Sequence, residues 1–269
     1  MNLQRVIVLL MVLCLSFNQN LFAQTVYPAS NDKKMIIIPE GQSRTFMFTN
    51  QTGVFYYGET GMLNTSQYQG LSYLTHKFLE DYILELGGIE LLRVKAEVHL
   101  IGDRIIRYFN DISVEEEVSM ADSLPILTIK IRAKHKTPMS ISPLISGSDK
   151  KQDFVIDWIP ADKMLYIARK NHLVRNDENN YPVWLGICTY PEGKYLATGS
   201  ESLTNKSQLI SQNVFYPGKI NMYLETETFI FFIIGDSKEQ TLENRNRMFK
   251  IFNINFTKPK SQIEGIRQT

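Results

Sequence analysis

Short apolar runs bounded by Gly, Pro, Asn or Asp dominate the chain, and helical periodicity is scarce. Runs of this kind, rich in β-branched and aromatic residues, are typical of β-strands. The pattern predicts strands over residues 34–40, 44–50, 53–59, 82–88, 97–103, 104–111, 112–120, 126–134, 163–170, 183–190 and 227–236. Many short strands without intervening helices indicate an all-β fold, a large antiparallel β-supersandwich.

Alternation within two of these runs predicts how the sheets are buried. Apolar Leu127, Ile129 and Ile131 alternate with polar residues, so one face of that strand should meet the core and the other should be wet. The run at 229–234, "FIFFII", has no polar position and should be buried on both faces. We therefore expect at least two packed layers.

The end of the chain breaks this pattern. Ser237 and Gln240 have the spacing of a capping box at the start of a helix. One apolar stripe follows at helical spacing, formed by Leu242, Met248, Phe249 and Phe252. We expect residues 24–236 to form the sandwich, and residues 237–269 to form a linker helix followed by an unstructured tail.

The first residues have the form of a secretory signal peptide, residues 1–23, with a short apolar run and Ala23 before the cleavage point. A lipoprotein with Cys14 as its lipidated residue is the alternative. The apolar run is too short to span a bilayer, and no membrane span is expected. Cleavage leaves Cys188 as the one cysteine, so no intramolecular disulfide is expected. The protein should be secreted, to the periplasm or the cell surface if the source is bacterial.

Charge and motifs exclude several function classes. The chain has 29 Lys and Arg against 28 Asp and Glu, which does not favour nucleic acid as a partner. It carries no nucleophile elbow, phosphate loop, dinucleotide fingerprint or zinc-binding helix, and its four histidines are scattered. We predict no cofactor, no metal and no catalytic residue.

A glycosidase would need two carboxylates, and no pair in the sequence stands out. The candidates considered are Glu59, Glu80, Asp81, Asp157 and the run at 115–117. Each is expected to be a solvated surface residue. Aromatic side chains could instead form a platform for sugar rings, or simply fill the core. These aromatics are Tyr56, Tyr57, Trp158, Tyr181 and Trp184, of which Tyr181 lies in a polar loop and should be exposed.

A polar string, residues 64–70, lies between two hydrophobic stretches, and the residues directly after it alternate poorly as a strand. Asn64 and Ser66 can bond to their own backbone and hold a turn, Tyr68 can pack one face, and Gly70 permits close approach of another backbone. Such a turn could present polar groups to a ligand, form an interdomain contact, or serve only as a structural corner.

This string, with "GDRIIRYFND" and "VEEEVSMADSLPILTIKIRA", resembles the N-terminal β-sandwich domain of bacterial glycogen-debranching-type (amylo-α-1,6-glucosidase-like) glycoside hydrolases. The resemblance covers most of residues 30–240. It is carried by an Asn-Thr-x-x-Tyr-x-Gly-Leu string, matched here by Asn64, Thr65, Tyr68, Gly70 and Leu71. The family often has Arg and His where this chain has Ser66 and Gln69, so contacts made by those side chains do not carry over.

The resemblance implies that the sandwich packs on an (α/α)₆ barrel through a linking helix, and that the barrel supplies the catalytic carboxylates. That barrel is absent from this sequence. We therefore expect a truncated accessory domain, inactive alone, whose partners are a catalytic barrel in cis or trans and an oligo- or polysaccharide. The expected sugar or interdomain contacts are Asn64, Ser66, Tyr68, Gln69, Tyr181 and Trp184.

Two other hypotheses remain open. The chain could be a free-standing glycan-binding module, or a complete small hydrolase with two carboxylates in an unrecognised site. The final helix separates the first two interpretations. An exposed apolar stripe would indicate a missing partner, whereas a stripe packed on its own sandwich would indicate independence.

Overall fold

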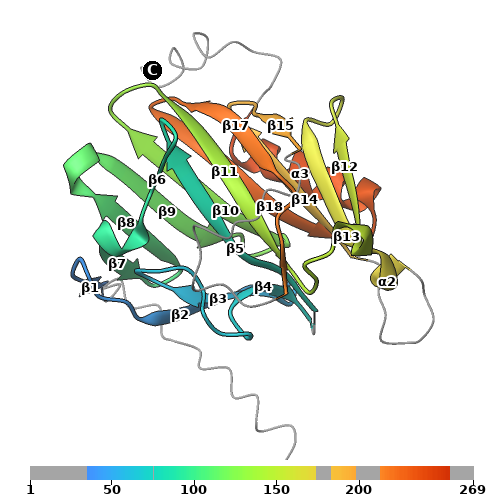
Figure 1. The fold of residues 1–269 in the computed structure, drawn as a ribbon, viewed down its shortest axis with the longest axis horizontal. Coiled ribbons are helices and arrows are strands. Elements are labelled where there is room, and N and C mark those ends of the chain that lie inside the picture. The colour runs from blue at the N-terminus through green and yellow to red at the C-terminus, as the bar shows by residue number, and fades with distance from the viewer. Residues whose placement is uncertain (1–34, 75, 174–182, 198–212, 255–269) are drawn as a thin grey trace, which may run out of the picture. The chain divides into compact units, whose positions relative to one another are not determined.

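The computed structural model describes residues 35–74, 76–173, 183–197 and 213–254, apart from the side chain of His172. These residues form two antiparallel β-sheets and a C-terminal helix (Figure 1). The predicted all-β sandwich is confirmed. The predicted signal peptide, Tyr181 and the predicted tail beyond residue 254 lie outside the described residues.

Sheet A has the strand order β1-β7-β8-β9-β10-β18-β14-β13-β12. Its strands are β1 (Met35–Ile38), β7 (Glu97–Ile101), β8 (Arg104–Phe109), β9 (Val114–Met120), β10 (Ile126–Ala133), β12 (Phe154–Ile159), β13 (Met164–Arg169), β14 (Trp184–Tyr190) and β18 (Glu227–Gly235).

Sheet B has the order β15-β17-β11-β5-β4-β3-β2, with β16 paired to β11 and β6 paired to β5. Its strands are β2 (Thr45–Thr49), β3 (Val54–Glu59), β4 (Gly70–Tyr73), β5 (His76–Leu86), β6 (Ile89–Glu90), β11 (Thr137–Ser146), β15 (Lys194–Leu196), β16 (Val214–Phe215) and β17 (Lys219–Leu224). The helical segments of the described chain are η1 (Arg93–Lys95), η2 (Asn110–Ile112), η3 (Lys151–Asp153), α2 (Lys170–Leu173) and α3 (Lys238–Ile251).

The main core lies between the two sheets. Ile105, Val118 and Ile129 of sheet A belong to the same buried apolar cluster as Leu79 and Ile141 of sheet B. Period-two side-chain alternation places these residues on the inner faces. In β10 the alternate positions lie on the outer face, where Lys130 and Arg132 are partly exposed as predicted but Thr128 is buried.

A second apolar cluster lies between the outer face of sheet A and helix α3, which packs on β18 and β14. Phe231 and Ile233 of β18 meet Met248 and Phe249 of the helix. This explains why β18 is buried on both faces, as predicted. The predicted stripe is therefore packed on its own sandwich, although Phe252 at its end is 42% exposed.

The start of α3 follows the predicted cap with one difference. The Ser237 side chain accepts a hydrogen bond from the Gln240 backbone N–H, as a capping box requires. The Gln240 side chain, however, accepts from the Asp236 N–H rather than from that of Ser237. None of the helices in the described ranges is long and apolar enough to span a membrane.

Two long strands of sheet B depart from the sequence prediction. β5 begins at His76 rather than at residue 82, because its first half carries Lys77, Glu80 and Asp81 among apolar residues and hides the alternation. β11 was not predicted at all. It contains Pro138 and Pro143, residues that lack the N–H used in a β-ladder.

Candidate functional site

The polar string after β3 fills a gap in sheet B. β4 pairs with β5 only as far as Leu79, and β6 pairs with it only at its end. Buried carbonyls between these points need other donors. The Asn64 Nδ2 donates to the Glu80 carbonyl at 2.7 Å, and the Arg93 Nη2 donates to the Tyr82 carbonyl at 3.0 Å. Side chains therefore take the place of a neighbouring strand.

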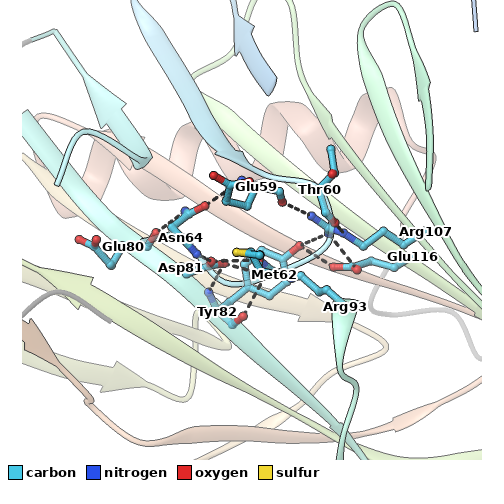
Figure 2. A network of polar contacts seen from close by, with 10 residues as sticks. All are labelled: Glu59, Thr60, Met62, Asn64, Glu80, Asp81, Tyr82, Arg93, Arg107 and Glu116. Atoms are coloured by element: carbon cyan, nitrogen blue, oxygen red, sulfur yellow. Dashed lines mark hydrogen bonds and ion pairs between the residues drawn. The ribbon is translucent and has the colours of Figure 1, made fainter. Parts of the chain in front are cut away.

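Asp81 orders both of these donors (Figure 2). Its two carboxylate oxygens accept from Arg93 Nη1 at 2.9 Å and Nη2 at 2.7 Å, a bidentate ion pair. The same carboxylate accepts the Asn64 backbone N–H at 2.7 Å. The Arg93 guanidinium also lies 4.5 Å from the centre of the Tyr82 ring. The start of the polar string is thereby fixed against β5.

A second ion pair reaches this loop from sheet A, as Figure 2 shows. Arg107 Nε donates to the Thr60 carbonyl at 2.6 Å, and its Nη1 lies 3.0 Å from Glu116 Oε2. The Tyr82 hydroxyl donates to Glu116 Oε1 at 2.5 Å. Burial raises the pKa of Glu116, but the guanidinium groups of Arg107 and Arg93 and the Tyr82 hydroxyl outweigh it, so the pKa lies below its ordinary value.

The second half of the string is held by Gln69. Its Oε1 accepts from the backbone N–H groups of Thr65 and Ser66 at 2.8 and 2.9 Å, and its Nε2 donates to Glu59 Oε1 at 2.7 Å. Gln69 is buried, whereas the Tyr68 side chain is 71% exposed. The Ser66 hydroxyl accepts from the Tyr68 N–H at 3.3 Å.

Gly70 ends the string with a φ of +131°, and a Cβ there would lie 2.2 Å from the Leu79 carbonyl oxygen. The close backbone approach predicted at Gly70 is therefore present. The corner uses the side chains of Asn64 and Gln69 for internal hydrogen bonds. Their contact with sugar or with a partner stays a prediction.

Three of the candidate acids are buried, against the expectation of solvated surface residues. Glu80, Asp81 and Glu116 are each at most 1% exposed. Each has a cationic partner: Lys77 Nζ lies 2.5 Å from Glu80 Oε2, and two arginines pair with the others. The partner of Asp81 is Arg93, which lies outside β5 in η1. The residues next to Asp81 in the sequence therefore do not reveal that it is buried.

The candidate aromatics within the described ranges do not gather into one platform. Tyr56 is 1% exposed and fills the core. Trp158 stacks on Tyr195 at a centroid distance of 6.0 Å, against the main core. Trp184 packs against the cluster under α3, and Lys238 Nζ lies 4.8 Å from its ring centre. Trp184 therefore lies on sheet A, away from the polar string of sheet B.

A cleft of about 610 Å³ opens on the outer face of sheet B, over β15, β17, β11 and the end of β5. Its aromatic side chain is Tyr223, which is 58% exposed. Its polar and charged lining residues are Glu85, Ser140, Glu192, Lys194, Lys219 and Asn221. None of the predicted contact residues that the structure describes lines this cleft.

The floor of the cleft is ordered by contacts among its own residues. The Ser140 hydroxyl donates to Glu85 Oε2 at 3.0 Å, and Lys219 Nζ lies 2.5 Å from the same oxygen. At the rim, Lys136 Nζ lies 5.2 Å from the centre of the exposed Tyr223 ring, a cation–π contact. The cleft thus combines fixed donors and acceptors with one exposed ring.

One sequence signal points to this cleft. In "KINMYL", residues 219–224, polar and aromatic side chains alternate with apolar ones. That alternation predicts a strand with a polar outer face. The other cleft residues come from distant segments, and only the strand register brings them together.

Among the described residues, no three His, Cys, Asp or Glu side chains are grouped to hold a metal ion. His99 Nε2 instead lies 2.8 Å from Glu97 Oε1 on β7. Cys188 is buried and unpaired under α3, and burial raises the pKa of its thiol to about 12.

No protein-family model matches this sequence, and no curated protein matches it. A bacterial glucoamylase complexed with acarbose is structurally similar, with 8% identity and a TM-score of 0.48, over 86% of this chain and 39% of that chain. A family GH92 α-mannosidase from Bacteroides thetaiotaomicron has 10% identity and a TM-score of 0.37, over 83% of this chain and 32% of that chain. This chain thus spans less than half the length of either enzyme.

Proposed function

We propose that this protein is a carbohydrate-associated β-sandwich that binds a neutral glycan in the cleft of sheet B. The cleft itself carries the proposal. Among the described residues that line it, two carboxylates, Glu85 and Glu192, are balanced by two ammonium groups, Lys194 and Lys219. Balanced charge favours an uncharged ligand over an anion or a cation.

The lining also suits hydroxyl groups, which both donate and accept hydrogen bonds. Asn221 offers two donors and an acceptor, while Glu85 accepts and Lys219 donates. The exposed Tyr223 ring can pack on the apolar C–H face of a sugar ring. A concave site that places a few polar groups beside an aromatic ring is typical of ligand-binding sites.

The sequence resemblance supports a finer proposal. In it, the protein is the secreted accessory domain of a debranching-type glycoside hydrolase and orients a catalytic (α/α)₆ barrel, supplied in cis or in trans. The barrel would carry the catalytic acid and base. The sandwich would complete one wall of its carbohydrate-binding cleft and would not hydrolyse glycosides by itself.

A second candidate function is a free-standing glycan-binding module. It is favoured by helix α3, whose Met248 and Phe249 are buried on sheet A rather than exposed for a partner. Both candidates use the same cleft and differ in whether a catalytic partner is needed.

Affinity electrophoresis in gels that contain neutral or charged polysaccharides tests glycan binding. We expect at least one neutral glucan or mannan to retard the protein, and Tyr223→Ala to abolish most of that retardation. Tyr68→Ala, which removes an even more exposed tyrosine at the polar string, is the matched control and should leave it unchanged. If Tyr68→Ala abolishes the retardation and Tyr223→Ala does not, the glycan binds at the polar string rather than in the cleft. If only charged polysaccharides retard the protein, the proposal is wrong.

A further inference from the structure

Four polar residues of the cleft, Lys194, Asn221, Ser140 and Glu85, form a row that crosses the strands of sheet B at right angles, and Glu90 continues it beyond the cleft. We infer from this row that the ligand is a linear oligosaccharide lying across the strands, rather than a single sugar or a branch point. This inference rests on the proposed function and deepens it. Figure 1 shows the strands that carry the row, from β15 through β17, β11 and β5 to β6.

Strand register defines the row. Lys194 of β15 pairs with Asn221 of β17, which pairs with Ser140 of β11. Ser140 in turn pairs with Glu85 of β5, and Glu85 pairs with Glu90 of β6. Directly paired residues of antiparallel strands point to the same face of the sheet, so these five side chains follow one line.

The length of the row sets the size of the ligand. Neighbouring strands lie about 4.8 Å apart, so four steps from Lys194 to Glu90 span roughly 19 Å. A pyranose ring in a linear chain is about as long as one such step. Ser140 and Glu85 are buried and hold each other in the floor of the row, whereas Lys194 is exposed and Asn221 and Glu90 are half-buried. The row can therefore contact several consecutive sugars along its length, which a monosaccharide could not use.

Flanking residues close the two sides of this track. Tyr223 lies two residues beyond Asn221 on β17, and Lys219 lies two residues before it, both on the same face. Lys136 contacts the Tyr223 ring and pairs with Glu225, with Lys136 Nζ 2.9 Å from Glu225 Oε1. The ring therefore lies beside the row with a cationic neighbour.

A second cavity lies at the Glu90 end of the row. Its volume is about 310 Å³, and Glu90 at the end of the row lines it. Met62, Leu92 and Val94 also line it and are 37–44% exposed. Arg93 fixes this cavity, because it holds the Met62 carbonyl at 3.3 Å from its Nη1 and pairs with Asp81. The end of a long glycan would reach an ordered, largely apolar hollow.

Titration calorimetry with malto-, cello- and manno-oligosaccharides of two to six residues tests this inference. In the series that binds, the dissociation constant should fall by about tenfold or more between the disaccharide and the longest member. Glu90→Gln should weaken binding of the longest member about threefold or more and leave that of the disaccharide unchanged. The matched control is Glu243→Gln on the exposed side of α3, which should change neither.

The outcomes separate the two proposals. If no neutral glycan of any length or polymer binds, the proposed function fails and this inference fails with it. If glycans bind with an affinity that does not depend on length, or if Glu90→Gln weakens all members equally, the proposed function stands and the linear track is wrong.

Discussion

Asn64 shows how one side chain can substitute for a strand. Its amide donates to the Glu80 carbonyl at 2.7 Å and accepts from the Glu59 N–H at 3.0 Å, in full burial. These are bonds that a neighbouring strand would otherwise supply. The polar string is therefore explained as a structural corner, and any ligand role of its half-buried Ser66 and exposed Tyr68 is a separate question.

Asn64→Ala should lower the free energy of unfolding by about 2–4 kcal/mol, because it leaves a buried carbonyl and a backbone N–H without partners. Urea denaturation monitored by tryptophan fluorescence measures this change. Tyr68→Ala, four residues away and exposed, should shift stability by less than about 0.5 kcal/mol. Equal small effects from both variants would contradict the structural role of Asn64.

Glu116 and Glu80 should give opposite pH signatures. The pKa of Glu116 is lowered below its ordinary value of 4.5 in the folded protein, so its ionisation stabilises the fold above that value, and this is lost as the pH falls through the folded pKa. Burial raises the pKa of Glu80 despite Lys77, so its ionisation opposes folding, and stability is lost as the pH rises through the folded pKa.

Urea denaturation at pH 4 and pH 7 tests this contrast. Relative to the wild type, Glu116→Gln should be more destabilising at pH 7 than at pH 4. Glu80→Gln should be less destabilising at pH 7 than at pH 4, or even stabilising at pH 7. If the change in the free energy of unfolding depends on pH in the same way for both variants, the pKa values of Glu116 and Glu80 are not shifted in opposite directions.

At the scale of elements, the sequence predicts strands well where one face is apolar and poorly where polar residues are buried. Alternation predicts β10, whereas the pattern predicts β5 only from residue 82 because Glu80 and Asp81 interrupt it. Their partner Arg93 lies beyond the strand, in η1. The sequence likewise predicts that Glu116 faces solvent, because its partner Arg107 belongs to another strand. The two residues meet only when β8 pairs with β9.

Local sequence patterns also do not predict the cleft. Ser140 and Glu85 meet because β11 pairs with β5, and β11 was hidden by its prolines. A strand that is not predicted cannot be assigned neighbours or a register.

Helix α3 should be part of the folding unit rather than a detachable linker. Met248→Ala removes a side chain that is 1% exposed under sheet A and should lower the free energy of unfolding by about 2–5 kcal/mol. Ile251→Ala, in the same helix but 63% exposed, is the control and should cost less than about 0.5 kcal/mol. If neither variant changes the urea midpoint, the helix does not contribute to the sandwich core.

At the scale of the whole molecule, the main core between the sheets and the cluster under α3 form a scaffold for the cleft on the far face of sheet B. The proposed role is binding, so the purified chain should release no reducing sugar from α-glucans. A reducing-end assay measures this. Release that disappears in Glu85→Gln would instead support a complete small hydrolase.

A crystal structure of the protein soaked with the longest oligosaccharide that binds in calorimetry would show where the glycan lies. We expect density for consecutive sugars across β17, β11 and β5, with one ring against Tyr223 and hydroxyl groups within hydrogen-bond distance of Asn221 and Lys194. Density at the polar string, or beside Trp184 at the start of α3, with an empty cleft would contradict this expectation.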